Sequence, residues 1–222
     1  MKKTLLLLLS LSFLFACNRK KDMHVDKDYE RYMEYKNIYT NYGKVPVDTT
    51  KAQLQDYLKH FPANAPAWVF YGRLQYDLNN IPEAINAYRK AAEANPRYPE
   101  AYSSIGAIYN FSGKTDSAKW YLRKALELKD SSSYTYVTLA GLLLSEKNAG
   151  AQALVDSALA RADSNAVIYA ALSASYAQTA DFKKSVEYYQ RATALGLRDT
   201  DGFKQVLAGQ TKLEDYYRKN KY

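Results

Sequence analysis

Side chains that carry most protein chemistry are scarce in this chain of 222 residues. It has one cysteine, Cys17, and two histidines, His24 and His60. A zinc site built from several such residues is therefore excluded. No glycine-rich phosphate loop, serine between flanking glycines or paired-histidine helix occurs. His60 falls at the end of an expected helix, which suits a helix terminus better than a general base. We expect no enzymatic activity, no cofactor and no metal.

Cys17 ends an apolar run near the N-terminus. Lys2 and Lys3 give a positive start, and residues 4–15 are apolar but too short for a membrane-spanning helix of about 20 residues. Leu14-Phe15-Ala16-Cys17 resembles the bacterial lipobox. That resemblance implies a signal peptide at 1–16, cleavage before Cys17 and a lipid on its sulfur, although an ordinary secretory signal or an uncleaved anchor remains an alternative.

The residue after the cysteine and the charge balance suggest where the chain resides and what it meets. Asn18, in place of the Asp that retains enteric lipoproteins on the inner membrane, implies the outer membrane, facing the periplasm. The net charge is +8, which permits acidic partners, an anionic membrane surface or nucleic acid. No tight basic cluster follows residues 19–21, so nucleic acid is not expected as a partner.

A period of about 34 residues organises the rest of the chain. Aromatic residues recur at this spacing, at Trp68, Tyr102, Tyr136 and Tyr169. Small residues follow each of them by four positions, at Gly72, Gly106, Ala140 and Ser173. Two further small sets keep the period, at Ala84, Ala118, Ala151 and Ser185, and at Ala91, Ala125, Ala158 and Ala192. Bulky residues lie between these sets, at Tyr88, Leu122, Val155 and Tyr189.

This pattern resembles the tetratricopeptide repeat over residues 65 to 199. The resemblance implies an all-α fold, a right-handed superhelix of stacked antiparallel helix pairs in which each repeat buries its apolar face on its neighbours. The expected repeats are 65–98, 99–132, 133–165 and 166–199. They are flanked by a lipidated tether with a tyrosine-rich helix at 17–48, a capping half-repeat at 49–64 and a C-terminal cap at 200–222. The segment 26–42 either packs on the half-repeat or lies near the membrane.

In tetratricopeptide proteins, the first helix of each pair lines a groove that holds a peptide or a partner helix. The resemblance maps this groove onto ten residues: Val69, Arg73, Tyr76, Asp77, Glu100, Asn110, Phe111, Tyr134, Val137 and Leu144. Aromatic residues in such a surface are typical binding anchors. The alternative is that some of these side chains only contact the next repeat, or that the C-terminal cap folds back over them.

Three functions fit these features. The leading hypothesis is a membrane-anchored scaffold or assembly factor that binds an envelope protein in the groove, with the membrane bound through the lipid on Cys17. A glycan- or lipid-binding envelope protein, and a non-catalytic subunit of an envelope enzyme complex, are the alternatives. Architecture alone does not decide among them.

Overall fold

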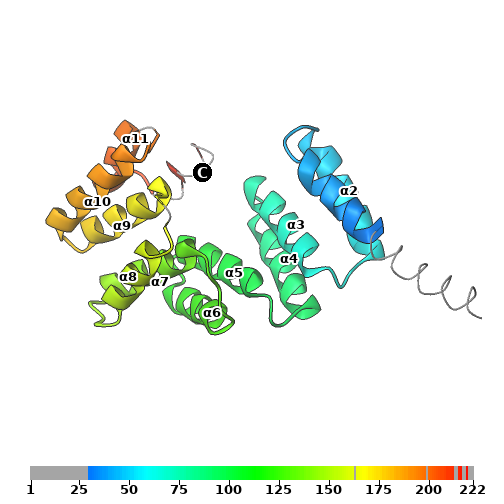
Figure 1. The fold of residues 1–222 in the computed structure, drawn as a ribbon, viewed down its shortest axis with the longest axis horizontal. Helices are drawn as coiled ribbons and strands as arrows, with labels where there is room; N and C mark the ends of the chain where they lie inside the picture. The colour runs from blue at the N-terminus through cyan, green and yellow to red at the C-terminus, as the bar shows by residue number, and fades with distance from the viewer. Residues whose placement is uncertain (1–29, 163, 199, 213–214, 217–218, 220–222) are drawn as a thin grey trace, which may run out of the picture. The chain divides into compact units, whose positions relative to one another are not determined.

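The chain forms two compact units of helices (Figure 1). The computed structural model describes residues 30–162, 164–198, 200–212, 215–216 and 219. The units are an N-terminal unit, Met1–Pro62, and a C-terminal unit, Ala63–Tyr222. All regular structure in the described residues is helical, as the resemblance implies. None of the described helices is long and apolar enough to cross a membrane, and the apolar run at 4–15 lies outside the described residues.

The described part of the N-terminal unit is a pair of packed helices. Residues 30–41 are helical, and α2 spans Val47–His60. The hydroxyl of Tyr57, on α2, donates a hydrogen bond of 3.4 Å to the backbone oxygen of Arg31. The ring of Tyr35 lies 5.9 Å from that of Tyr57. Residues 30–41 therefore pack on α2, which is the first of the two arrangements considered for this segment.

The helices of the C-terminal unit follow one another in antiparallel pairs, and the two helices of each pair pack together. The first helices of the pairs are α3 (Ala65–Asp77), α5 (Pro99–Phe111), α7 (Ser133–Ser145) and α9 (Ala166–Gln178). The second helices are α4 (Ile81–Ala94), α6 (Thr115–Glu127), α8 (Ala151–Leu159) and α10 (Phe182–Ala194). We refer to these pairs as repeats 1 to 4. One more described helix with assigned bounds, α11 (Thr200–Leu207), follows them.

The turn inside each repeat has a recurring backbone shape. One residue in each turn adopts a left-handed conformation: Asn79, Gly113, Lys147 and Ala180, with φ of 60°, 69°, 55° and 61°. A left-handed residue after a helix lets the backbone reverse direction while the last carbonyls find donors. Three of the four residues are not glycine, so the repeat packing imposes this shape.

In repeats 1 and 2, a glycine on the first helix faces a larger side chain on the second. A Cβ added at Gly72 would lie 2.6 Å from the Tyr88 ring, and one added at Gly106 would lie 2.8 Å from Cγ of Leu122. Repeat 4 has serine at the small position, and the buried Ser173 hydroxyl donates a 2.7 Å hydrogen bond to the backbone oxygen of Ser185. The small residues of the sequence pattern therefore let the two helices of a repeat approach closely.

Gly106→Ala is expected to destabilise the C-terminal unit even though alanine favours helices. The new methyl group would meet Cγ of Leu122 at 2.8 Å and its backbone nitrogen at 3.2 Å, and the backbone cannot move aside cheaply. Overpacking costs about 1–3 kcal/mol, against a helix-propensity gain of about 1 kcal/mol. Urea unfolding followed by circular dichroism would measure the net loss. The double variant Gly106→Ala/Leu122→Val copies the Ala140 and Val155 pair of repeat 3, and it should recover part of the loss. Equal stability of wild type and Gly106→Ala would contradict the close approach.

Successive repeats do not all stack in the same way. α5 packs mainly on α4, and α7 mainly on α6, but α9 packs mainly on α7. At that crossing, a Cβ on Gly141 would lie 2.7 Å from Oγ of Ser175. α8 is the shortest of the paired helices, with nine residues. The short α8 and the bare backbone at Gly141 together allow α9 to approach α7.

The C-terminal end continues the repeat pattern. Phe203, on α11, is fully buried and stacks on Tyr189 with 5.8 Å between ring centroids and 5° between ring planes. It packs in one cluster with Ala170 and Ala174 of α9. Phe203 lies 34 positions after Tyr169, so α11 takes the place of the first helix of a further repeat. It covers the apolar end that a solenoid must protect from water.

Candidate functional site

The ten predicted groove residues fall into two groups in the structure. Six of them lie on α3 and α5 and are exposed or half-buried: Arg73, Tyr76, Asp77, Glu100, Asn110 and Phe111. We call these six residues the α3–α5 face. The other four lie in the packing between helices, or at its edge.

The α3–α5 face combines an aromatic pair with several charges. Tyr76 and Phe111 come from the last turns of α3 and α5, and their ring centroids lie 6.3 Å apart. This separation is typical of interacting aromatic side chains. Asn110 precedes Phe111 on the same helix and is half-buried. Two first helices of different repeats therefore contribute to one aromatic surface.

The charges of this face gather around a buried phenol. Burial raises the pKa of Tyr88 well above its usual value, and the negative charges of Asp77 and Glu100 raise it further. A hydrogen bond with Ser104 and the positive charge of Arg73 act in the opposite direction. Arg73, Asp77 and Glu100 thus all lie close enough to Tyr88 to act on it. The face therefore carries charges of both signs, with Asp77 at the end of α3 and Glu100 in the first turn of α5.

Val69 and Val137 were predicted to line the groove, and the structure places both in the core. Val69 is 5% exposed and packs with Ala101 and Ile105 of the next first helix, α5. Val137 is 1% exposed and packs with Ile168 and Leu172 of α9. Both valines point along the stack toward the following repeat, so they stabilise it instead of meeting a ligand.

Tyr134 and Leu144 of α7 lie at the edge of the same packing. Both are half-buried and pack against the cluster formed by α7, α8 and α9. The close approach of α9 to α7 at Gly141 accounts for this, because α9 occupies the space beside that part of α7. The structure therefore groups these two residues with the stacking of repeats 3 and 4, away from the α3–α5 face.

No arrangement suited to catalysis emerges in the part of the chain that the structure describes. No group of three or more His, Cys, Asp or Glu residues there could hold a metal ion. His60 Nδ1 lies 2.9 Å from the backbone oxygen of Asp56 in the same helix, which suits the helix-terminal role expected for it. Cys17 and His24 lie outside the described residues.

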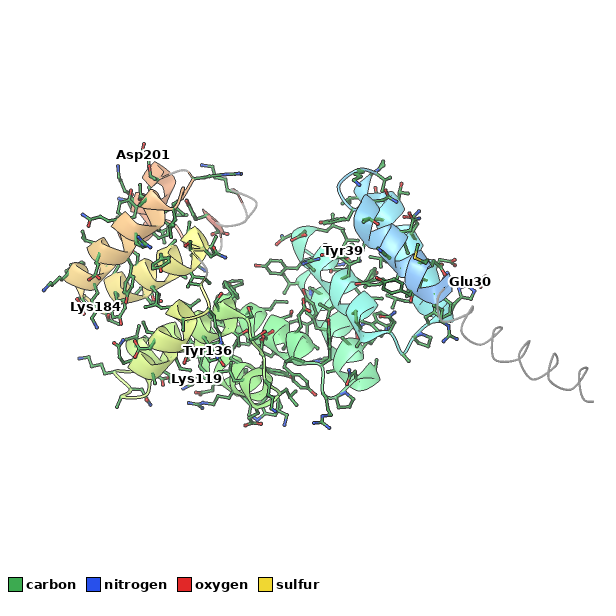
Figure 2. The ribbon with its side chains drawn as sticks, viewed as in Figure 1. Glu30, Tyr39, Lys119, Tyr136, Lys184 and Asp201 are labelled. Atoms are coloured by element: carbon green, nitrogen blue, oxygen red, sulfur yellow. The ribbon has the colours of Figure 1, made fainter. Side chains whose placement is uncertain are left out.

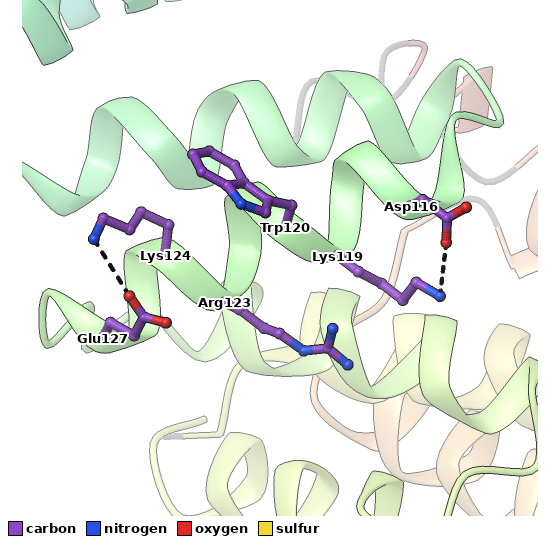
Figure 3. A pocket seen from close by; sticks show the side chains of 6 residues that line it. All are labelled: Asp116, Lys119, Trp120, Arg123, Lys124 and Glu127. Carbon is purple, nitrogen blue, oxygen red and sulfur yellow. Dashed lines mark hydrogen bonds and ion pairs between the residues drawn. The ribbon is translucent and has the colours of Figure 1, made fainter.

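A second feature was not anticipated, a hollow on α6 with an exposed tryptophan (Figure 3). Six residues spaced along one face of the helix line it: Asp116, Lys119, Trp120, Arg123, Lys124 and Glu127. We call this the α6 hollow. The buried residues of α6 are Ala118, Leu122 and Ala125. Trp120 lies off that stripe, and this sequence signal could have singled it out, because a tryptophan there cannot be part of the repeat core.

Tyrosines fill the junction between repeats 3 and 4. Tyr176 and Tyr188 stack with 5.5 Å between centroids. Lys184, which is labelled in Figure 2, places its Nζ 4.8 Å from the Tyr176 ring. The Tyr176 hydroxyl also donates a hydrogen bond of 3.5 Å to Gln152 of α8. Burial raises the pKa of Tyr188 to about 12, and the neighbouring Tyr176 is the next largest cause.

The raised pKa values of Tyr188 and Tyr88 predict that the folded protein loses stability at strongly alkaline pH. Between pH 10 and about 12, Tyr188 keeps its proton in the folded chain and loses it in the unfolded chain, whose pKa is near 10.0. The folded state then binds more protons, so the free energy of unfolding falls as the pH rises through this window. Urea unfolding at about pH 9 and about pH 11 would measure the slope. Tyr188→Phe should flatten part of it, with Tyr88 carrying a remainder; an unchanged slope would contradict the assignment.

Family models match the repeats directly. One described as "TPR repeat" matches residues 72–110, and one described as "Tetratricopeptide repeat" matches residues 99–132 and 166–195. No curated protein matches the chain in sequence. The matched stretches cover most of repeat 1 and the helices of repeats 2 and 4, with Gly72, Gly106 and Tyr169 of the periodic sets, whereas residues 133–165 lie outside them.

Solved structures share the fold at low sequence identity. PilW, a widely conserved type IV pilus biogenesis factor, is 15% identical with a TM-score of 0.66, covering 86% of this chain and 93% of its own. TTC0263 of Thermus thermophilus, a thermophilic TPR protein, is 18% identical with a TM-score of 0.62, covering 81% and 98%. YrrB, a TPR protein with an unusual peptide-binding site, is 17% identical with a TM-score of 0.55, covering 84% and 97%. The matching family models, the paired helices and these structural likenesses show that this chain contains tetratricopeptide repeats.

Proposed function

We propose that this chain is a lipid-anchored interaction scaffold, or assembly factor, of the bacterial envelope that binds a protein segment on its α3–α5 face. The observation that carries the proposal is the Tyr76–Phe111 pair, with ring centroids 6.3 Å apart, next in sequence to Asp77 and with Arg73 one turn earlier on α3. Aromatic and arginine side chains are the residue types that contribute most to protein interfaces. The pair spans two repeats, so its geometry depends on their correct stacking.

The structural relatives support a role in binding proteins. YrrB is described as having a peptide-binding site, and PilW as a pilus biogenesis factor. Neither description assigns a partner to this chain. They favour the scaffold hypothesis over a glycan carrier because both describe repeat proteins of similar length that act on polypeptides or assemblies of them.

Anchoring rests on the sequence around Cys17. Lipidation there would hold the mature chain at the periplasmic face of the outer membrane, since two or three acyl chains bind a bilayer stably. Confinement to the membrane raises the effective concentration of the scaffold toward partners in the same membrane. An α3–α5 face of modest affinity would then be enough to hold a partner.

Cross-linking in native envelope tests the proposed binding face. We expect wild-type protein to capture a specific protein, and the Tyr76→Ala/Phe111→Ala variant to lose it. The matched control is Tyr32→Ala/Phe182→Ala, which removes the same two side-chain types from exposed positions elsewhere. Capture that survives in the Tyr76/Phe111 variant, at equal thermal stability, would show that the α3–α5 face is not the binding surface.

The anchor is tested separately by Cys17→Ser. Mass spectrometry of the mature wild-type N-terminus should show a lipidated cysteine, and the variant should leave the membrane fraction or keep its uncleaved N-terminus. An unmodified Cys17 in the wild-type protein would refute the lipoprotein part of the proposal and leave the binding face untouched.

A further inference from the structure

The α6 hollow has features of a second binding site on the C-terminal unit. Its six residues recur in steps of three and four along α6, at 116, 119 and 120, 123 and 124, and 127. Their side chains therefore project from one side of the helix. The buried stripe of α6, with Ala118, Leu122 and Ala125, packs into the repeat and leaves this side to the solvent. The α3–α5 face belongs to other helices, so the two surfaces do not share a residue.

Two of the three cations in the hollow are already paired. Lys119 Nζ lies 3.0 Å from Asp116 and also forms a close ion pair with Glu146, which follows α7. The hydrogen bonds to Glu146 and Asp116 raise the pKa of Lys119. Lys124 Nζ lies 3.3 Å from Glu127. Both lysines of the hollow therefore already have carboxylate partners.

Arg123 is different. Its side chain is exposed, and no hydrogen bond or ion pair joins it to any residue that the structure describes. Figure 3 shows its guanidinium clear of the two pairs that the dashed lines mark, extending from α6 in a different direction from the Trp120 indole. Its planar group carries several donors that match a carboxylate with two parallel hydrogen bonds.

Trp120 supplies the apolar part of the hollow. It is 58% exposed, and its ring meets Tyr121 edge-on with 4.8 Å between centroids. A large indole left in water is a poor contribution to the folding of a monomer. Tryptophan and arginine are among the residue types most enriched at the few interface positions that dominate binding energy.

We propose that the α6 hollow is a second docking site, which takes an acidic segment of a partner protein through a carboxylate on Arg123 and an apolar side chain on Trp120. Removal of residues 1–16 takes away Lys2 and Lys3 and leaves a net charge of +6, which still favours encounter with an acidic partner. With one occupant on the α3–α5 face and another on α6, the chain joins two proteins. This second site goes beyond the proposed function, and it stands or falls independently of the α3–α5 face and of the anchor.

Peptide selection on the full chain, purified in detergent, tests the charge and apolar requirements together. The probe is a phage-displayed library of random dodecapeptides, selected against wild type, Trp120→Ala, Arg123→Glu and a control. The control is Lys183→Glu, which reverses an exposed cation on α10. We expect wild type and control to enrich peptides with a carboxylate near an apolar residue, and both hollow variants to lose them. For the synthesised winning peptide, Trp120→Ala should weaken binding by about 30-fold or more.

Tryptophan fluorescence then locates the bound peptide. The chain has two tryptophans, so Trp68→Phe leaves Trp120 as the sole emitter. Bound peptide should protect Trp120 from acrylamide quenching in the Trp68→Phe protein. The proposal is overturned if no enriched peptide loses binding in the two hollow variants, if the peptides that do lose binding lack carboxylates, or if their binding leaves the quenching of Trp120 unchanged. Protection of Trp120 by soluble peptidoglycan fragments, with none by acidic peptides, would show a sugar site and would also overturn it.

Discussion

Replacing Phe203 by alanine is expected to lower the free energy of unfolding by about 3–5 kcal/mol. Phe203 is fully buried, with Tyr189 stacked on one side and Tyr216 at 5.2 Å. The substitution would leave a cavity where α11 covers Ala170 and Ala174. In a stacked repeat array, loss of an end helix exposes the whole apolar face beneath it. Urea unfolding followed by circular dichroism would measure the loss.

Phe182→Ala is the matched control for this prediction. Phe182 begins α10 and is 65% exposed, so removing the same side chain there should change stability by no more than about 0.5 kcal/mol. If the two variants lose similar stability, Phe203 does not close the end of the stack. If only Phe203→Ala is destabilised, α11 acts as the cap.

Asp130→Ala is expected to cost about 2–3 kcal/mol, because hydrogen bonds to charged groups contribute more than neutral ones. Asp130 is 9% exposed and lies between α6 and α7. Its carboxylate accepts hydrogen bonds from the Thr135 hydroxyl at 2.7 Å and from the Ser132 backbone nitrogen at 2.9 Å. Without it, the buried Thr135 hydroxyl and the start of α7 lose their acceptor. Thermal and urea unfolding would both report the change.

Asp130→Asn separates charge from geometry at this position. Asparagine keeps one acceptor oxygen, so we expect its free energy of unfolding to lie between those of the wild type and the alanine variant. An alanine variant as stable as wild type would show that the start of α7 does not depend on Asp130.

The repeat pattern predicted the fold because it is a regular alternation of small and large side chains. Gly72 and Gly106 face Tyr88 and Leu122 as the alternation of small and large residues requires. The expectations of a tetratricopeptide-repeat protein and of an all-α solenoid are confirmed by the family models and the structural likenesses. The same period reaches Phe203, which the sequence reasoning placed only in a general capping segment.

The exposure of the ten predicted groove residues was anticipated less well than the fold. Helical periodicity identifies which residues share one side of α3 or α7, but it does not say what lies opposite that side. Val69 and Val137 share a side with groove residues and are covered by the next first helix. Tyr76 and Phe111 could be nominated from the sequence, whereas their distance of 6.3 Å depends on how repeats 1 and 2 stack. Trp120 was missed because the search followed the first helices of the pairs.

The sequence by itself therefore determined the helix pairs, their order and their internal packing, since neighbours about 16 positions apart must fit by size whatever surrounds them. It also carries the Cys17 motif, on which the anchoring proposal depends. Only the tertiary structure decided which faces stay open. The approach of α9 to α7 across Gly141 and the closure of the last repeat by Phe203 arise from contacts between repeats. Such contacts depend on the angle at which whole helices cross, and many side chains set that angle together.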